Sequence, residues 1–156
     1  MGANVYITRE GAARLQDELS ALRSRDRPKI VHEVSEAAAQ GDRSENAEYI
    51  YGKKKLREID RRIVWLMKRL DNLTVVDPRH DAVEIAYFGA YVEVENDGGA
   101  RLTYRIVGED EADPDQGRIS WRSPIGRALL RRQAGDQVTF ASPSGPVELT
   151  VLAVRY

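Results

Sequence analysis

One run of small and apolar residues constrains the fold of this 156-residue chain more than any other feature. From residue 49 to residue 73 these side chains recur at alternating intervals of three and four: Tyr49, Gly52, Leu56, Ile59, Ile63, Leu66, Leu70 and Leu73. Such spacing places them on one stripe of an α-helix and is typical of a coiled-coil seam. Because a stripe of this kind is stable only when it is buried, the sequence predicts a second helix packed against it.

The residues before this stripe can provide the second helix. Thr8 is a suitable N-cap, and apolar residues then mark one face: Leu15, Leu19, Leu22, Val31, Val34 and Ala38. Pro28 interrupts the pattern, and because proline lacks a backbone N–H and clashes with the preceding turn, we expect a kink or short break near residues 25–28. The two stripes predict an antiparallel helical hairpin with an arm of roughly 40 Å.

A heptad pattern can also pair two separate chains, so a structural coiled-coil dimer is an alternative to the hairpin. Gly41 and the polar residues after it favour a turn within one chain. We therefore expect a monomer, and concentration-dependent sedimentation would distinguish the two.

The turn between the helices, residues 41–47, carries two carboxylates, Asp42 and Glu45. Carboxylate oxygens suit Mg²⁺, but two of them do not complete an octahedral site. A nucleic-acid enzyme that already holds one metal could supply the remaining ligands, and a pair of metals can activate water against a phosphodiester. Asp42 and Glu45 are therefore predicted to be metal ligands that act in trans, at the active site of a partner.

A simpler interpretation of the same two residues is structural. Asp-x-x-Glu at the start of a helix resembles a capping box, in which Asp42 accepts from the backbone near residue 45 and Glu45 reaches back. Spacing alone favours the cap, and the two roles are compatible.

Charge is unevenly distributed along the chain. The net charge is −1, yet residues 1–79 carry +3 and residues 80–156 carry −4. Residues 53–69 alone hold eight basic and two acidic side chains. Solvation of a helix surface accounts for many such runs, but this imbalance predicts a positive stripe that follows an RNA or DNA backbone. The candidate RNA-binding residues are Lys53, Lys54, Lys55, Arg57 and Arg61.

Composition excludes several classes of protein. Cysteine is absent, which excludes disulfides and thiolate metal sites, and His32 and His80 are the only histidines. No secretion signal begins the sequence, and no apolar run approaches the roughly 20 residues of a membrane span. We expect a soluble, cytoplasmic protein without a membrane partner.

A change of hydrophobic period after Pro78 predicts a second domain, with the boundary between residues 1–79 and 80–156. Residues 91–95 and 102–107 alternate with period two around an Asn-Asp-Gly-Gly turn, and residues 138–141 and 147–154 flank a second turn. Ser123 and Pro124 are typical of a helix start, here predicted to run to Arg132. The fold class is therefore α+β, a helical hairpin followed by a compact α+β domain.

The loop that contains the Ser-Pro pair is a candidate docking patch. We expect Ile125 to point outward there. The residues predicted to bind a partner protein are Arg122, Ser123, Pro124 and Ile125.

Two stretches carry a resemblance to a known family: residues 41–49, Gly-Asp-Arg-Ser-Glu-Asn-Ala-Glu-Tyr, and the basic run from Lys53 to Arg62. Together with residues 9–11, 105–108 and 123–130, they resemble the Gre transcript-cleavage factors of bacterial RNA polymerase, the GreB branch in particular. The resemblance covers nearly the full length.

This resemblance implies an N-terminal coiled coil that enters the polymerase's secondary channel and a C-terminal domain of FKBP-like fold. It further implies that Asp42 and Glu45 help hold a second Mg²⁺ of the polymerase, which cleaves backtracked RNA and so rescues arrested complexes, while the factor alone is not an enzyme. The basic side chains would lie near the extruded RNA 3′ end. Arg122 departs from the family pattern, which tends to have Asp before the Ser-Pro pair, and the reversed charge bears on the details of docking.

Two rival functions accompany this expectation. A Gre-like factor could occupy the channel and modulate or inhibit the polymerase without cleavage, although the intact acidic pair argues against it. An FKBP-like fold also suggests a peptidyl-prolyl isomerase, but a fold does not confer that activity, which requires an apolar pocket lined by aromatic residues.

Overall fold

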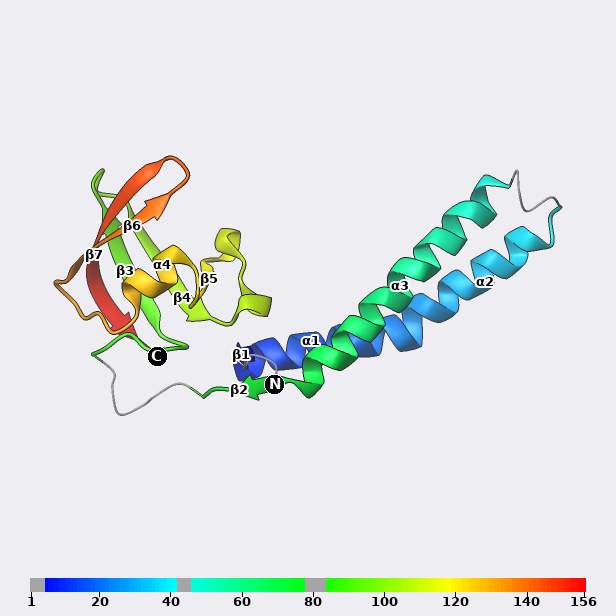
Figure 1. The fold of residues 1–156 in the computed structure, drawn as a ribbon, viewed down its shortest axis with the longest axis horizontal. Helices are drawn as coiled ribbons and strands as arrows, with labels where there is room; N and C mark the ends of the chain where they lie inside the picture. The colour runs from blue at the N-terminus through cyan, green and yellow to red at the C-terminus, as the bar shows by residue number, and fades with distance from the viewer. Residues whose placement is uncertain (1–4, 42–45, 78–83) are drawn as a thin grey trace. The chain divides into compact units, whose positions relative to one another are not determined.

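The computed structural model describes residues 5–41, 46–77 and 84–156, which form two compact units (Figure 1). One unit is helical and comprises Ala12–Asn72. The other combines Met1–Gly11 with Leu73–Tyr156 and contains a mixed β-sheet. The α+β fold class is confirmed. The expected boundary after residue 79 falls among residues 78–83, outside the described ranges, so that division stays a prediction.

The first arm of the hairpin is one irregular helix. It consists of α1 (Arg9–Ala21), a π-helical turn η1 (Leu22–Asp26) and α2 (Arg27–Ala38). In η1 the backbone N–H of Arg27 donates to the carbonyl of Leu22, five residues earlier. An α-helix would press the Pro28 ring onto the carbonyl four residues back, and the wider turn just before it relieves this clash. The predicted irregularity is present, but it begins three residues earlier than expected.

This π turn changes which residues the first arm buries. A π turn adds one residue to the helical repeat and so rotates the following apolar face by one position. Ile30 is 6% exposed and Ala37 3%, whereas Val31 is 41% exposed. The prediction that Val31 belongs to the buried stripe is therefore wrong, and Ala37 rather than Ala38 is the fully buried alanine.

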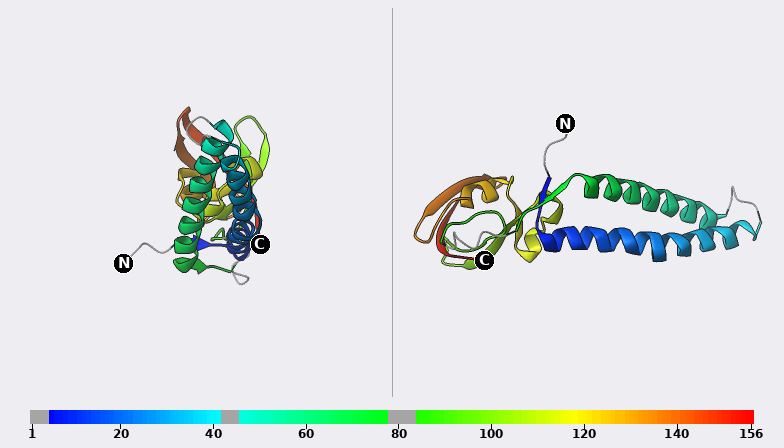
Figure 2. Two further views of the ribbon diagram at one scale, coloured as in Figure 1. Left: turned by 90° about the vertical axis from the view of Figure 1, so that its right-hand side faces the viewer. Right: turned by 90° about the horizontal axis from the view of Figure 1, so that it is seen from below.

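The second arm, α3 (Ala47–Asp71), lies alongside the first arm (Figure 2). Its burial follows the predicted seam closely. All seven of its seam positions are buried or half-buried, while Leu73 belongs to a strand instead of the helix. Gly52 allows α2 to approach, since a Cβ there would lie 2.7 Å from Cγ2 of Val34. No helix in the described ranges has the length and apolar content that a bilayer span requires.

Five strands form the sheet of the second unit, in the order β5-β4-β3-β7-β6. Their bounds are β3 Tyr91–Asn96, β4 Arg101–Val107, β5 Arg118–Ser120, β6 Gln137–Ser142 and β7 Gly145–Arg155. All neighbours are antiparallel except β4 and β5. Both predicted strand pairs, β3 with β4 and β6 with β7, are confirmed.

Alternation along the strands builds the core of this sheet. Val92 and Val94 are fully buried on one face of β3, and Val151 of β7 packs with them. A short helix, α4 (Pro124–Leu129), contributes Leu129 to the same cluster. The helix was expected to reach Arg132, but it ends at Leu129, and Arg131 adopts a left-handed conformation with φ of 67°.

A two-stranded sheet was not anticipated from the sequence. β1 (Val5–Ile7) pairs in parallel with β2 (Leu73–Val75). The strand that precedes the first arm therefore lies beside the strand that follows the second arm. Two short 3₁₀ turns, η2 (Glu109–Glu111) and η3 (Pro114–Gln116), connect β4 to β5. Three-residue strands carry almost no periodic signal, which explains why β1 and β2 escape sequence reasoning.

Candidate functional site

Asn46 ties the two arms together at the end of the hairpin. Its Oδ1 accepts from the backbone N–H of Tyr49 at 3.1 Å, which makes it the N-cap of α3. Its Nδ2 donates to the carbonyl of Ala37 near the end of α2 at 2.7 Å. One side chain thus satisfies an orphan donor of one helix and an acceptor of the other.

Asp42 and Glu45, the predicted metal ligands, lie outside the described residues, so their role stays a prediction. Within the described ranges, no group of three or more His, Cys, Asp or Glu side chains is arranged to hold a metal ion. The capping alternative required Asp42 to begin the second helix. Since α3 begins at Ala47 and Asn46 provides its cap, that alternative does not describe how α3 starts.

The five predicted RNA-binding side chains all lie on α3, where Lys53 is half-buried and the other four are exposed: Lys54, Lys55, Arg57 and Arg61. Positions 54, 57 and 61 are three and four residues apart, so they share the face opposite the seam. In the part of the chain that the structure describes, none of these five forms a side-chain ion pair or hydrogen bond. No carboxylate among the described residues of the hairpin neutralises these charges through an ion pair.

Other arginines of the hairpin behave differently. Arg62 donates to both carboxylate oxygens of Glu18, at 2.8 and 3.0 Å, and Arg27 pairs with Asp60 at 2.8 Å. Each pair bridges the two arms, and the raised pKa of Arg27 follows from its hydrogen bond to Asp60 and the charge of that carboxylate. These exposed pairs fix the register of the arms and add little stability each.

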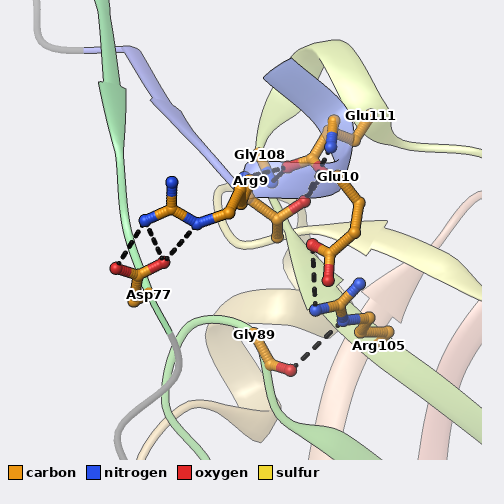
Figure 3. Close-up of polar contacts among 9 residues, drawn as sticks. Arg9, Glu10, Asp77, Gly89, Arg105, Gly108 and Glu111 are labelled. Carbon is orange, nitrogen blue, oxygen red and sulfur yellow. Dashed lines mark hydrogen bonds and ion pairs between the residues drawn. The ribbon is translucent and has the colours of Figure 1, made fainter. Parts of the chain in front are cut away.

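A buried carboxylate, Glu111, organises the second unit (Figure 3). It is 5% exposed and accepts from the backbone N–H groups of Thr8 and Gly108, both at 2.9 Å, and from the Thr8 hydroxyl. The same hydroxyl accepts from the N–H of Gly11 at 3.0 Å, which confirms Thr8 as a cap of α1. A charged acceptor is thereby held at a helix N-terminus, where the helix dipole favours negative charge.

Two glycines make room for this carboxylate. A Cβ on Gly11 would overlap the Glu111 side chain, and a Cβ on Gly108 would overlap the carbonyl oxygen of Tyr6. Neither position tolerates a side chain without displacement of β1 or η2. The Glu111 cradle, defined as Thr8, Gly11, Gly108 and Glu111, is therefore closely packed.

Two ion pairs, one exposed and one with a largely buried arginine, lie beside the cradle. Arg9 holds Asp77 with both oxygens within 3.0 Å of Nη2, and Arg105 lies 3.6 Å from Glu10 while donating to the Gly89 carbonyl (Figure 3). Hydrogen bonding to the backbone of the first helical turn lowers the pKa of Glu10, and the charge of Arg105 lowers it further.

We predict that Glu111→Gln lowers the free energy of unfolding by about 2–3 kcal/mol, because the amide places an NH₂ group against buried donors. Urea denaturation followed by circular dichroism would measure the loss. Glu148→Gln, at an exposed position of β7, is the matched control and should leave the midpoint unchanged. Equal midpoints for the two variants would contradict the assigned role of the cradle.

A second prediction concerns pH. Because the folded-state pKa of Glu10 is lowered, its stabilising contribution is present above the ordinary value of 4.5 and is lost as the pH falls through the lowered pKa. Glu10→Gln should therefore lower the midpoint of urea unfolding at about pH 7 and have no effect well below pH 4.5. A difference that persists in acid would show that the carboxylate charge is not the cause.

The predicted docking loop is well defined. The Ser123 hydroxyl accepts from the Gly126 N–H at 3.1 Å and donates to the Ser120 carbonyl at 2.6 Å, which confirms it as the N-cap of α4. Arg122 and Pro124 are exposed. Ile125 is half-buried and packs against the sheet core, so the expectation that it points outward is wrong. The binding role of the loop stays a prediction.

Half of the described aromatic residues of this unit pack against the core. Four of them contact the core cluster: Tyr104, Trp121, Phe140 and Tyr156. The Tyr156 hydroxyl also donates to the Ile85 carbonyl at 2.6 Å. A peptidyl-prolyl isomerase needs an apolar pocket lined by aromatic residues. In the described part of this unit, these four aromatic residues pack on the core, so they do not favour that function.

Comparison with known proteins shows which family has this sequence. The family model "Transcription elongation factor, N-terminal" matches residues 5–75, and "Transcription elongation factor, GreA/GreB, C-term" matches residues 80–156. Transcription elongation factor GreB of Yersinia pestis is 50% identical over 156 residues, which cover 100% of this chain and 91% of that protein. GreB of Haemophilus influenzae is 49% identical, with 100% and 99% covered. Among solved structures, GreA factor homolog 1 (Gfh1) of Thermus thermophilus is 27% identical, with 99% of this chain and 100% of that chain covered and a TM-score of 0.44.

The helical hairpin, the mixed sheet and these matches define a transcription elongation factor. The chain belongs to the GreA/GreB family and is GreB-like, and the resemblance seen in the sequence is confirmed.

Proposed function

We propose that this elongation factor binds bacterial RNA polymerase, inserts its helical hairpin into the secondary channel and stimulates cleavage of backtracked RNA by the polymerase active site. Arrested complexes would resume from the new RNA 3′ end. The factor would have no nuclease activity alone and would act as a monomer in the cytoplasm. The observation that carries the proposal is the helical hairpin itself, whose arms precede and follow the acidic residues in the sequence. Within the described residues, five cations of α3 form no side-chain ion pair or hydrogen bond: Lys53, Lys54, Lys55, Arg57 and Arg61.

The chain's own groups would act in two ways. Asp42 and Glu45 would donate carboxylate oxygens to a Mg²⁺ held jointly with the polymerase and would orient the attacking water. When bound, that ion would supply Lewis-acid stabilisation of the phosphodiester. The outer face of α3, with Lys54, Arg57 and Arg61, would hold the extruded RNA through its phosphates.

Asp42→Asn tests the acidic pair directly. Asparagine has nearly the size and shape of aspartate but is a weaker ligand for a hard cation. In stalled complexes with extruded RNA and Mg²⁺, we expect the release of short 3′ fragments to slow by about 100-fold, within the range seen when metal-site residues are lost.

The control is a binding measurement, because Asp42→Asn should retain the affinity of the wild type for polymerase. Full cleavage by this variant and by Glu45→Gln would contradict the proposal. If the wild type binds and no fragments appear, the factor is a channel-binding modulator, the rival function.

Arg57→Glu tests the RNA-binding face. Reversal of one phosphate contact should raise the factor concentration for half-maximal cleavage roughly tenfold and lower the slope of its salt dependence by about one. Arg101→Glu, on β4 of the other unit, is the control for a change of net charge. Equal effects of the two reversals would show that the overall charge matters and the face of α3 does not.

A further inference from the structure

A groove of about 350 Å³ lies between the two arms of the hairpin, beside the π turn. η1 and α2 form one side of it and α3 forms the other. π turns within α-helices are frequent at functional sites, and the volume is at the lower end of the range for small-molecule sites. We name it the π-turn groove and define it by six residues: Lys29, Ile30, Glu33, Tyr51, Lys55 and Ile59.

We propose that the π-turn groove binds one nucleotide, with the phosphate at Lys29 and Lys55 and an amino-bearing base between Tyr51 and Glu33. This site goes beyond the proposed function, because it requires only the hairpin and the ligand. Two sources share the chemistry, a free nucleoside monophosphate and a nucleotide of the extruded RNA. The second source rests on the proposed function.

Charged groups are sorted along the π-turn groove. An adjoining hollow nearer the turn of the hairpin shares Glu33 with the groove and adds two carboxylates, Glu36 and Glu48. Lys29 and Lys55 line the groove and not that hollow. One end of the groove is therefore cationic and the other acidic. A ligand with a phosphate at one end and hydrogen-bond donors at the other fits this arrangement, whereas a plain polyanion is repelled by the acidic end.

The cationic end has two lysines that remain available to a ligand. Lys29 and Lys55 are exposed, and neither forms an ion pair with any residue that the structure describes. Asp26, the acidic residue that η1 contributes to the groove, is already paired with Arg25 at 3.0 Å. Since one lysine comes from each arm, both can approach the same phosphate as point charges.

The acidic end suits a base. Tyr51 is 66% exposed beside the groove, and an exposed aromatic ring next to cations is typical of base stacking. Glu33 is exposed and has no ion pair or hydrogen bond among the described residues. A carboxylate accepts from the amino group of cytosine and repels the carbonyl oxygen that uracil has at the same position. The groove should therefore prefer cytosine to uracil.

The length and the inner surface of the groove agree with one nucleotide. From Tyr51 to Ile59 it extends roughly 12 Å along α3, at 1.5 Å per residue, which accommodates a nucleotide from its phosphate to the far edge of its base. Ile30 and Ile59 are each 6% exposed, so the ligand meets an apolar surface between the two polar ends.

NMR titration of the full-length factor with CMP and UMP, without polymerase, tests the inference. CMP should shift the amide signals of the groove, and UMP should bind at least fivefold more weakly. Tyr51→Ala should weaken CMP binding about tenfold, whereas Tyr51→Phe keeps the ring and should bind like the wild type. Ile50→Ala, which removes an exposed apolar side chain one residue away, is the matched control and should leave CMP binding unchanged.

Two further variants test the ends of the groove separately. Glu33→Gln should abolish the preference for CMP over UMP, because an amide offers both a donor and an acceptor. Lys55→Ala should weaken CMP about fivefold and leave the binding of cytidine, which has no phosphate, unchanged. The matched controls are Glu148→Gln and Lys68→Ala, at exposed positions outside the groove, and both should behave like the wild type.

The RNA tetranucleotide CpCpCpC distinguishes the two sources. Binding at least tenfold tighter than that of CMP assigns the groove to an RNA strand, and equal or weaker binding assigns it to a free nucleotide, so either result supports the site. Three results would each overturn the inference: no shift of the groove amides with CMP, equal affinity for CMP and UMP, or unchanged CMP binding by Tyr51→Ala.

These measurements also separate the inference from the proposed function. If CMP binds and the wild-type factor releases no RNA fragments from stalled complexes, the proposed function fails and the groove stands. If fragments appear and CMP does not bind, only the groove is overturned.

Discussion

The buried carboxylate of Glu111 is the interaction on which the second unit depends. One of its oxygens accepts hydrogen bonds from the backbone N–H of Thr8, near the start of the chain, and from that of Gly108, about a hundred residues later. An ionised group that is 5% exposed is stable only when its oxygens are fully hydrogen-bonded, and here three donors converge on it. Residues 5–11 therefore belong with the sheet, although the whole of the other unit, Ala12–Asn72, separates them from it in sequence.

The helical unit is held by different means. Its stability comes from a continuous apolar stripe, and its register comes from Gly52, from the ion pairs between the arms and from Asn46 at the end. Each of these contacts joins residues on facing helices. The π turn before Pro28 is part of the same solution, since it lets the first arm pass a proline without breaking.

Local patterns could be predicted from the sequence, and long-range contacts could not. The stripe of α3 and the β3–β4 pair repeat a fixed period over many residues, so both follow from the sequence. The burial of Ile30 instead of Val31 depends on one extra residue in a helical turn, and the Glu111 cradle joins residues 103 apart. Asn46 was missed although its signal was present, because an asparagine directly before a helix is among the strongest N-caps.

The net charge of the chain is a poor guide to what the hairpin can bind. Whether each cation is already paired with a carboxylate is a better one. The sequence alone does not distinguish Arg27 and Arg62 from Arg57 and Arg61. In the structure, carboxylates of the facing arm form ion pairs with Arg27 and Arg62. Lys54, Arg57 and Arg61 have no ion-pair partner among the residues that the structure describes. Successive members of this set are about 5–6 Å apart along α3, closer than the Debye length of roughly 8–10 Å, so they act together on a nearby polyanion. A chain of net charge −1 thus presents a positive face, because Glu18 and Asp60 of the hairpin pair with arginines of the facing arm and the excess of acidic residues lies in residues 80–156.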